Sequence, residues 1–525
     1  MTLPPQAAEM RQDSPQRAGA VLLVNPRTSS PRSIHLPLSI LALAAVLDAR
    51  YRCHLLDGNL EQESMHAKVR AALEADDLIA VGITVMPGPQ VAPSIAISRA
   101  IRVARPDLPI IWGGYFPTLY ADAAINAEYV DFLVRGQGED TLRELLVALE
   151  QGARARTPAV LAPIHGLSWK SGGSIVHNPD RAFRSPGAFP QPPYHLLGNV
   201  ERFLRPTFLG RRTAQHQAAI GCRYRCRFCG VVSMFNGVTR LPAPDRLEAD
   251  LRFLRDRYDV DSIQYMDNNF FDTEDASREL LGALRRVHLP YWCFARADAL
   301  ANFSAETWSM IRSSGLRMAY IGAETASEAL LKEMKKGTRV DHTIEVAYRC
   351  RENGVIPEFS FILGGPDDPE GEIERTFRFI RRLKSINPKC EIVLYFYSPV
   401  PQRDPRAARD EHSGAHLPRL AAYGPAGPAL PTTPEEWAQA RWVDYVCHFD
   451  APWLTPRIRR KVENFGRVLA CRFPTVQDRR TPAWAKHGLR ILSSWRYASG
   501  VYGFSWELEL ARRLTALRNP AVESI

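Results

Sequence analysis

The chain has 525 residues, of which 45% are hydrophobic and 24% charged, and its formal net charge is +10. These are ordinary globular values, and they exclude a disordered chain, a collagen-like fibre and a small disulfide-stabilised protein. At roughly 100–200 residues per domain, the length predicts about three domains. No apolar run approaches the roughly 18 residues of a membrane span, and the first residues lack the apolar core of a secretory signal. We therefore expect a cytoplasmic protein with a loose tail over residues 1–19.

Positive charge is concentrated at the C-terminal end. Residues 451–525 contain 14 Lys and Arg against 5 Asp and Glu, which accounts for +9 of the net +10. The nearly neutral remainder argues against a nucleic-acid-binding protein and indicates one local basic surface. Aromatic side chains are mixed with these basic ones. They are either core residues beside a solvated charged face, or part of a surface that contacts an anionic membrane, an acidic carrier or an acidic substrate.

The first part of the chain alternates short apolar segments with helical patterns. This alternation predicts a doubly wound parallel sheet of the Rossmann or flavodoxin-like class over residues 20–152. Sheets of this class bind ligands at the carboxyl ends of their strands. The expected strands are Val21–Asn25, Cys53–Asp57, Leu78–Thr84, Pro109–Trp112 and Val130–Arg135.

Three of the nine cysteines are close together in the sequence. Cys222, Cys226 and Cys229 have the spacing C-x3-C-x2-C, and Phe228 precedes the last of them. Thiolates are soft ligands that suit zinc or an iron–sulfur cluster. A structural zinc site takes four ligands, and no fourth Cys or His follows closely. A [4Fe–4S] cluster with three protein ligands instead leaves one iron open to an external ligand.

The pattern of three cysteines with an aromatic residue before the last resembles the motif of the radical S-adenosylmethionine (SAM) enzymes. The resemblance implies that the three cysteines hold a [4Fe–4S] cluster and that SAM chelates its open iron. It also implies that the cluster, reduced by a donor such as flavodoxin or ferredoxin, cleaves SAM to a 5′-deoxyadenosyl radical. The alternatives are three unrelated buried thiols and a zinc knuckle.

The segments around the cysteine motif fit the same family. A connector over residues 153–212, with a hairpin turn at Lys170–Ser174, leads into six further β-α units over residues 213–401. They match the partial (β/α)6 barrel of radical SAM enzymes, in which chemistry lies at the carboxyl ends of the strands. A Pro-rich linker or lid is expected over residues 402–433, and a small, mostly helical, basic domain over residues 434–525.

Three short motifs before the connector resemble the cobalamin-binding domain that precedes many radical SAM domains. They are Pro37–Leu47, Gly113–Thr118 and Arg135–Glu139, the last of which departs from the usual Gly-Glu-Gly-Glu through Gln137. The alternative is a flavodoxin-like domain with ordinary turns. The residues that this resemblance implies for cobalamin binding are Thr84, Gly113, Gly114, Tyr115, Gly136, Gly138 and Glu139.

One cobalamin motif is missing. Some cobalamin proteins supply a histidine ligand to cobalt from an Asp-x-His-x-x-Gly sequence, which this chain lacks. We therefore expect cobalamin without a histidine ligand. His35 and His54 are interpreted as surface or packing residues.

The resemblance also implies SAM-binding residues at the barrel strand ends. Asp267 is either a ligand of the SAM ammonium group or a turn residue, and Arg296 either pairs with the SAM carboxylate or forms a structural ion pair. Glu324 binds ribose hydroxyls or caps the helix that begins near Ser327. Two glycines, Gly364 and Gly365, make room for adenine, and Phe228 packs near it. Cys293, on a barrel strand, is expected to be a core residue.

Together these modules resemble the cobalamin-dependent, class B radical SAM methyltransferases. The activity implied is methylation of an unactivated carbon in a small-molecule, lipid or carrier-bound substrate. Two alternatives stay open: oxidative cyclisation or rearrangement with the same cofactors, and a cobalamin- or redox-sensing regulator without a reaction of its own. The cofactors implied are a [4Fe–4S] cluster, SAM and cobalamin. The sequence does not identify the substrate.

Overall fold

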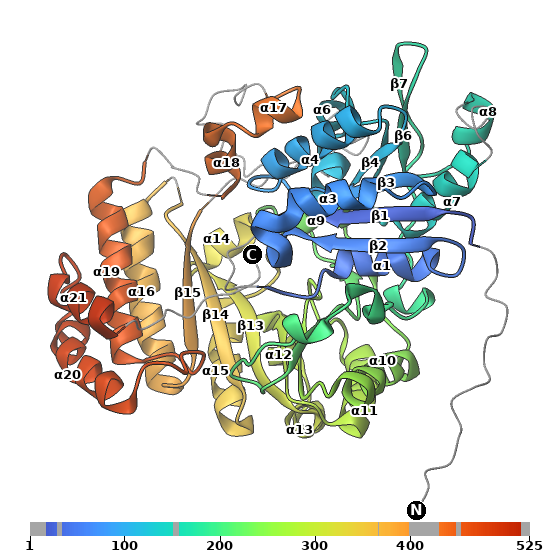
Figure 1. Ribbon diagram of the computed structural model, residues 1–525. Coiled ribbons are helices and arrows are strands. Elements are labelled where there is room, and N and C mark those ends of the chain that lie inside the picture. The colour runs from blue at the N-terminus through green and yellow to red at the C-terminus, as the bar shows by residue number, and fades with distance from the viewer. Residues whose placement is uncertain are drawn as a thin grey trace, which may run out of the picture.

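The structure is a computed structural model that describes residues 17–28, 34–150, 157–365, 367–397, 430–447 and 453–515. It contains two large sheets, each with helices packed on it (Figure 1). The strands β1–β7 form the N-terminal sheet. The second sheet begins at β8 and ends at β15, and the last helices of the chain lie beside it.

The N-terminal sheet has the strand order β2-β1-β3-β4-β5-β6-β7. Its first five strands are parallel and mostly buried, which explains why they read as continuous apolar segments. The predicted doubly wound sheet is confirmed, and the order 2-1-3-4-5 is the flavodoxin-like one. The five strands are β1 (Ala20–Asn25), β2 (Arg52–Asp57), β3 (Leu78–Thr84), β4 (Ile110–Gly113) and β5 (Phe132–Val134).

Helices cover both faces of this sheet. Helices α1 (Leu38–Leu47) and α7 (Glu139–Glu150) bury residues against one face. Helices α3 (Met65–Leu73) and α4 (Val91–Ala104) pack on the opposite face. Because each α-helix follows a parallel strand, the loops that leave the carboxyl ends of the strands all meet at one edge of the sheet.

A hairpin extends the sheet beyond the predicted domain end. Strands β6 (Leu167–Ser171) and β7 (Ser174–His177) lie in the segment interpreted as a connector, and the turn expected at Lys170–Ser174 joins them. Strand β6 pairs with β5 in the antiparallel direction, and Trp169 is 2% exposed between the sheet and its helices. The connector therefore completes the N-terminal sheet before it leads to the barrel.

The second sheet is the predicted partial barrel. Its six strands are parallel and follow the order β15-β14-β13-β12-β11-β8. Helices α10 (Pro244–Tyr258), α11 (Glu274–Val287), α13 (Ala305–Ser314), α15 (Val340–Asn353) and α16 (Pro369–Ile386) lie along its outside (Figure 1). The strands are β8 (Thr213–His216), β11 (Ser262–Tyr265), β12 (Tyr291–Ala295), β13 (Leu316–Glu324), β14 (Ile356–Leu363) and β15 (Glu391–Phe396).

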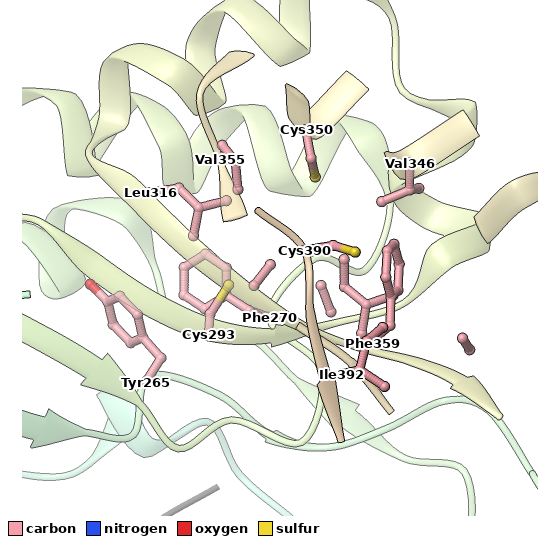
Figure 2. Close-up of a cluster of buried hydrophobic side chains, with 14 of the residues drawn as sticks. Tyr265, Phe270, Cys293, Leu316, Val346, Cys350, Val355, Phe359, Cys390 and Ile392 are labelled. Atoms are coloured by element: carbon pink, nitrogen blue, oxygen red, sulfur yellow. The ribbon is translucent and has the colours of Figure 1, made fainter. Parts of the chain in front are cut away.

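The barrel core between strands and helices contains several thiols. Cys293, Cys350 and Cys390 are fully buried, and they lie among apolar side chains such as Leu316 and Phe359 (Figure 2). Burial raises the pKa of Cys293 well above its ordinary value. Its interpretation as a core residue is therefore confirmed, because a neutral buried thiol behaves as a small apolar side chain.

The C-terminal region is helical, as predicted, but it packs in two places. Helices α17 (Pro434–Trp437) and α18 (Ala440–Cys447) lie on the N-terminal domain, where Trp437 contacts Tyr120 with ring centroids 4.2 Å apart. Helices α19 (Pro456–Arg472), α20 (Ala483–Ser499) and α21 (Trp506–Thr515) lie beside α16 and β15 (Figure 1). Most of the predicted Pro-rich linker lies outside the described residues.

None of the described helices is both long enough and apolar enough to cross a membrane.

Candidate functional site

A cavity of about 480 Å³ lies at the carboxyl edge of the N-terminal sheet. Helix α1 and the loops after β1, β3, β4 and β5 form most of its wall. Backbone and apolar groups dominate this wall. All seven residues that the cobalamin resemblance singled out line this one cavity: Thr84, Gly113, Gly114, Tyr115, Gly136, Gly138 and Glu139.

Two glycines in the wall are required by geometry. Gly114 has φ +94°, and a Cβ atom there would lie 2.9 Å from Thr84 Oγ1 and 3.0 Å from the Val85 carbonyl oxygen. Gly138 has ordinary φ, but a Cβ atom would lie 3.0 Å from Val134 Cγ1. A larger residue at Gly114 would strain the backbone and push the loops apart. The cavity therefore depends on the absence of side chains at these positions.

A polar network joins the loops after the first three strands. Gln90, which is 1% exposed, donates from Nε2 to Asn25 Oδ1 at 2.9 Å and accepts the Met86 N–H at 2.8 Å. Asn25 in turn donates to Asp57 Oδ1 at 2.7 Å. Burial raises the pKa of Asp57 to about 6. Buried polar groups that hydrogen-bond to one another fix the loops in one arrangement.

Two further side chains hold the glycine loops in place. Thr118 donates from Oγ1 to the Gly114 carbonyl at 2.7 Å and accepts the Gly136 N–H at 2.9 Å, so it links two loops of the cavity. Gln137, where the motif departs from the usual acidic residue, accepts the Arg184 N–H at 2.7 Å. The Gln137 side chain also donates to the Arg184 carbonyl. These two hydrogen bonds connect the glycine loop to the segment that leads to the barrel.

The barrel closes the far side of the cavity. Met234 and Phe235 belong to α9 (Gly230–Phe235), the short helix that starts directly after Cys229. Met266 and Asn268, which follow β11, also line the cavity. Tyr115, from the N-terminal domain, packs against Met234 and Phe235. The cavity is therefore shared between the two domains, and the cysteine loop adjoins its barrel wall.

The cysteine loop follows β8 and precedes α10. Strands β9 (Ile220–Gly221) and β10 (Thr239–Arg240) pair in the antiparallel direction and close its base. Gly221 has φ +75° and donates its N–H to Asn268 Oδ1 at 3.1 Å. Cys226 is buried, while Cys222 and Cys229 are partly buried. Burial raises the pKa of Cys229 to about 11 and also raises that of Cys222.

No group of three or more His, Cys, Asp and Glu side chains in the described residues could hold a metal ion. The three thiols therefore do not converge on a single-ion site such as a zinc knuckle. In a [4Fe–4S] cluster with three protein thiolates, each thiolate binds a different iron, so the sulfurs stand further apart than around one ion.

Arg296 fastens the cysteine loop to the end of β12. Its Nη1 donates to Cys226 Sγ at 3.5 Å, and its guanidinium carbon lies 3.5 Å from the centroid of the Tyr224 ring. The same guanidinium pairs with Asp298 at 2.9 Å and donates to the Lys336 carbonyl. Burial lowers the pKa of Arg296, but Asp298 outweighs that effect and raises it. The structure shows the ion-pair alternative that the sequence left open.

A second buried ion pair faces the same loop. Lys336 Nζ lies 2.5 Å from Glu324 Oε1 and 5.5 Å from the centroid of the Phe228 ring. Burial lowers the pKa of Lys336, but the Glu324 carboxylate and the Cys226 thiol outweigh it and raise the pKa. Glu324 has φ +61°. Ser327, not Glu324, caps the next helix by accepting the Leu330 N–H, so the capping alternative for Glu324 is wrong.

Asp267 lies deep behind the strand end. It is 0% exposed, and its Oδ1 accepts the Ala219 N–H at 2.5 Å. Its Oδ2 has no hydrogen-bond partner among the described residues. Burial raises the pKa of Asp267 to about 8. The carboxyl group thus supports the backbone that enters the cysteine loop, and its second oxygen is buried.

The two glycines after β14 differ from each other. Gly364 has φ +81°, and a Cβ atom there would lie 2.4 Å from Leu454 Cδ2. Its carbonyl accepts the Trp453 indole N–H at 2.9 Å. At Gly365 the nearest atom, Leu330 Cδ2, would be 4.0 Å away. The space beside Gly364 is filled by Leu454, so the C-terminal segment, and not an open pocket, accounts for this glycine.

Sequence reasoning missed several site residues. Lys336 stands in an ordinary Lys-Lys-Gly run, Asp298 lies inside a helix, and Gln90 precedes one. Nothing in the sequence distinguishes these from surface residues. For Thr118 a signal existed, because it closes the Gly113–Thr118 motif.

Two family models match the chain. The B12 binding domain model matches residues 25–146, and the Radical SAM superfamily model matches residues 218–380. The chain is therefore a radical SAM enzyme that carries a B12 binding domain. The cofactors of these two domains are cobalamin for the first, and SAM with a [4Fe–4S] cluster for the second.

Individual relatives are distant. The cytidylyl-2-hydroxyethylphosphonate methyltransferase of Streptomyces wedmorensis is 24% identical over 67% of this chain and 76% of its own length. The anaerobic magnesium-protoporphyrin IX monomethyl ester cyclase of Rubrivivax gelatinosus is 22% identical over 54% of this chain and 51% of its own. The cobalamin-dependent SAM radical enzyme OxsB, solved with aqua-cobalamin bound, has the same fold: the TM-score is 0.62 at 16% identity, over 94% of this chain and 75% of OxsB.

Proposed function

We propose that this enzyme methylates an unactivated carbon atom of a small-molecule substrate. The observation that carries the proposal is the shared cavity, which the N-terminal domain and the barrel line together next to the cysteine loop. In this position, cobalamin and the cluster with SAM would face the same cavity. When bound, the cluster with SAM supplies a 5′-deoxyadenosyl radical and cobalamin supplies a methyl group. The chain itself positions the groups and excludes water.

Two buried cations lie beside the three cysteines. Cys222, Cys226 and Cys229 are the proposed ligands of the cluster. Arg296 and Lys336 keep two positive charges beside these thiols, which favours their ionised form and reduction of a bound cluster. Because each cation has its own buried carboxylate partner, Asp298 or Glu324, neither needs a ligand to stay ionised.

We propose that the other residues at the barrel strand ends contact SAM. Phe228 offers an aromatic face beside the cysteines for adenine. Glu324 offers its second oxygen to ribose hydroxyls, and Asp267 offers Oδ2 to the SAM ammonium. For Arg296 the SAM carboxylate would be an additional partner beside Asp298. Gly365 leaves open space, whereas Gly364 does not.

The N-terminal side gives a large cofactor room. Gly113, Gly114, Gly136 and Gly138 expose backbone to the cavity, and the described residues that line it include no histidine. We therefore propose that this chain gives cobalt no imidazole ligand. An electron paramagnetic resonance spectrum of the Co(II) enzyme should lack nitrogen superhyperfine splitting from a protein imidazole. A spectrum with that splitting would refute this part of the proposal.

The test of methylation is isotopic. The reconstituted enzyme, with reduced flavodoxin or ferredoxin as electron donor, is incubated with methyl-deuterated SAM and candidate substrates. The proposal expects a product that carries the labelled methyl group, together with 5′-deoxyadenosine. Turnover that releases 5′-deoxyadenosine but leaves the product unlabelled would reject methylation.

Oxidative cyclisation is the second candidate, because one relative is named as a cyclase. It uses the same radical and predicts an unlabelled product that is lighter by two hydrogens. The mass of the product therefore separates the two candidates in the same experiment. A chain that forms no 5′-deoxyadenosine with any substrate would instead support a sensor without a reaction of its own.

A further inference from the structure

Large apolar side chains are exposed mainly at the C-terminal end of the structure. Of the fourteen described residues in this category, nine lie between Val476 and Leu514. The most exposed among them include Trp484 at 77%, Trp506 at 69% and Leu514 at 80%. Soluble monomers rarely gather such residues in one place without a partner for them.

Helix α20 carries one stripe of them. Trp484, Ile491 and Trp495 are seven and four residues apart, so they lie on one side of the helix. They are exposed, whereas Leu489 and Ser493 are buried on the side that packs on α19. The helix thus has two apolar sides, and only one of them is covered by the residues that the structure describes.

Helix α21 carries a second stripe. Trp506, Leu510 and Leu514 follow one another at intervals of four residues and are exposed, while Leu508 is fully buried. Arg496 joins the two helices: its guanidinium carbon lies 4.5 Å from the Trp495 ring centroid and 4.3 Å from that of Phe504.

Arg496 is itself held rigidly. It is 1% exposed and pairs with Glu507, and its Nη1 also donates to the Phe504 carbonyl. The aromatic rings on both sides of it are therefore fixed by a buried ion pair. We call the exposed side chains of Trp484, Ile491, Leu492, Trp495, Phe504, Trp506, Leu510 and Leu514 the α20–α21 face.

The charge around this face is positive. Residues 479–515 contain seven Lys and Arg and two Glu. Both glutamates are already in ion pairs, Glu507 with Arg496 and Glu509 with Arg513. Arg479, Arg480 and Arg490 are exposed. The segment that carries the face is therefore net positive, which favours an acidic partner.

We propose that the α20–α21 face binds the surface of an anionic phospholipid membrane. The face is built from exposed side chains of two helices that contact each other, and apolar side chains among basic ones suit an anionic bilayer. Tryptophan side chains favour the boundary between headgroups and acyl chains, because the indole has a large apolar body and one polar N–H group. Basic side chains beside them add attraction to anionic headgroups.

The face lies away from the cofactor cavity. In Figure 1, α20 and α21 are at the outer end of the barrel, beyond α16 and α19. The cavity lies at the carboxyl edge of the N-terminal sheet. Membrane binding would therefore not depend on cofactors. It adds a location to the proposed function without resting on it, and it selects the membrane among the partners that the basic C-terminal segment suggested.

The test is flotation of the full-length reconstituted enzyme with vesicles. One set contains phosphatidylcholine alone, and the other contains phosphatidylcholine and phosphatidylglycerol in equal parts. The enzyme should float with the anionic vesicles, and less so at high salt. Removal of one basic side chain, by Arg490→Gln, should lower the affinity about fivefold. Equal flotation with both vesicle types, or flotation with neither, would overturn the proposal.

Two matched variants separate the face from exposed apolar residues in general. Trp484→Ala with Trp506→Ala should lower vesicle affinity at least about tenfold, because the two most exposed indoles are lost. Val103→Ser changes an equally exposed residue on α4 (84%) and should have no effect. Iron content and SAM cleavage should be unchanged in all variants. A concentration-dependent dimer that the double variant abolishes, without vesicle binding, would assign the face to a second copy of the chain.

Discussion

The N-terminal wall of the shared cavity and the cysteine loop, which adjoins its barrel wall, are built on opposite principles. We call this loop with its two ion pairs the cysteine wall. On the N-terminal side, glycines at Gly114 and Gly138 remove side chains, and polar groups such as Thr118 bind only backbone. On the cysteine side, the buried ion pairs of Arg296 with Asp298 and of Lys336 with Glu324 place full charges beside the thiols. One wall provides volume, and the other provides fixed charge.

This difference corresponds to what each cofactor requires. A corrin ring is large and flat and needs room and apolar contact, whereas a cluster with bound SAM carries charge that the protein must balance. We therefore expect the N-terminal wall to be sensitive to added atoms and tolerant of small charge changes. The cysteine wall should be sensitive to charge and tolerant of small changes in volume.

The largest effect should come from the thiols. Replacing Cys222, Cys226 and Cys229 together by alanine removes every proposed protein ligand of the cluster. The variant should contain no cluster iron after anaerobic reconstitution and form no 5′-deoxyadenosine, while cobalamin binding remains. Iron analysis, product chromatography and the cobalamin absorption spectrum measure these three properties. A triple variant that still cleaves SAM would contradict the assignment of the whole cysteine wall.

Lys336→Met should be the most damaging single change in buried charge. It leaves Glu324 ionised and unpaired in a buried site, which costs about 3–5 kcal/mol of unfolding free energy. Urea denaturation at neutral pH measures the loss. Adding Glu324→Gln to the same chain removes the stranded charge and should restore most of the stability.

The double variant also tests function. If Lys336 acts on the cluster, Lys336→Met with Glu324→Gln should regain stability but keep a lowered reduction potential of the cluster. If the pair is only structural, the potential of the double variant will equal that of the wild type. The claim that the charges of the cysteine wall serve the cluster would then be wrong.

Gly114→Ala tests the N-terminal wall. The new Cβ atom meets Thr84 Oγ1 and the Val85 carbonyl at a positive φ, and the strain should cost about 1–3 kcal/mol. If the same loop contacts cobalamin, a loss of 1.4 kcal/mol in binding corresponds to about a tenfold rise in Kd. Cobalamin titration and urea denaturation measure the two effects.

Gly173→Ala is the matched control. Gly173 has φ +82° in the β6–β7 turn, and no atom lies within 4 Å of its added Cβ. The control should lose stability through backbone strain but bind cobalamin normally. If both variants bind cobalamin equally well, Gly114 is a structural glycine and the cavity wall tolerates added atoms.

The sequence predicts the N-terminal wall well, for physical reasons. Strand and helix periodicity places five loops at one sheet edge, and the residues that must be glycine are visible as glycine. Gly113, Gly114, Gly136 and Gly138 were all singled out, and all line the cavity. The hairpin β6–β7 was missed as part of this sheet, because pairing with β5 is a long-range contact that local patterns do not encode.

The cysteine wall is less visible in the sequence. The three thiols are eight residues from end to end, so their grouping is local and readable. Their charged surroundings are not: Arg296 and Lys336 come from different loops, and their contacts form only when the barrel closes. The same limit applies to the C-terminal region, where the helices are readable but their division between two domains is not.

Asp267 gives the cysteine wall a dependence on pH. Burial raises its pKa to about 8 from an ordinary value of 3.8, so between these values the folded chain binds one more proton than the unfolded chain. Its contribution to the free energy of unfolding should therefore fall by up to about 1.4 kcal/mol per pH unit as the pH rises. The amide of Asp267→Asn cannot ionise. The unfolding free energy of the variant, relative to that of the wild type, should therefore rise with pH by that slope.

Urea denaturation of both proteins between about pH 5 and about pH 8 measures the difference in slope. The expected result is a difference in unfolding free energy that grows steadily in favour of the variant with rising pH. A constant difference across this range would show that Asp267 is already ionised in the folded protein. Its free oxygen would then be a better partner for a cationic ligand than its burial indicates.

The smallest effect, that of Gly365→Ala, is compared with that of Gly364→Ala to distinguish a glycine that serves packing from one that serves a cofactor. Gly364→Ala places a Cβ atom 2.4 Å from Leu454 Cδ2 at φ +81°, and it should cost about 1–3 kcal/mol of unfolding free energy. Gly365→Ala meets nothing closer than 4.0 Å and should cost less than about 0.5 kcal/mol.

Leu454→Ala removes the atom that the new methyl group meets, so the costs of Gly364→Ala and Leu454→Ala should not add. The double variant should be more stable than the sum of the single changes predicts, and the KM for SAM should be unchanged throughout. If Gly364→Ala instead raises the KM for SAM without a loss of stability, this glycine faces the cofactor. SAM binding in the barrel would then require space without side chains, as the N-terminal wall does for cobalamin, and the two sides would follow one principle.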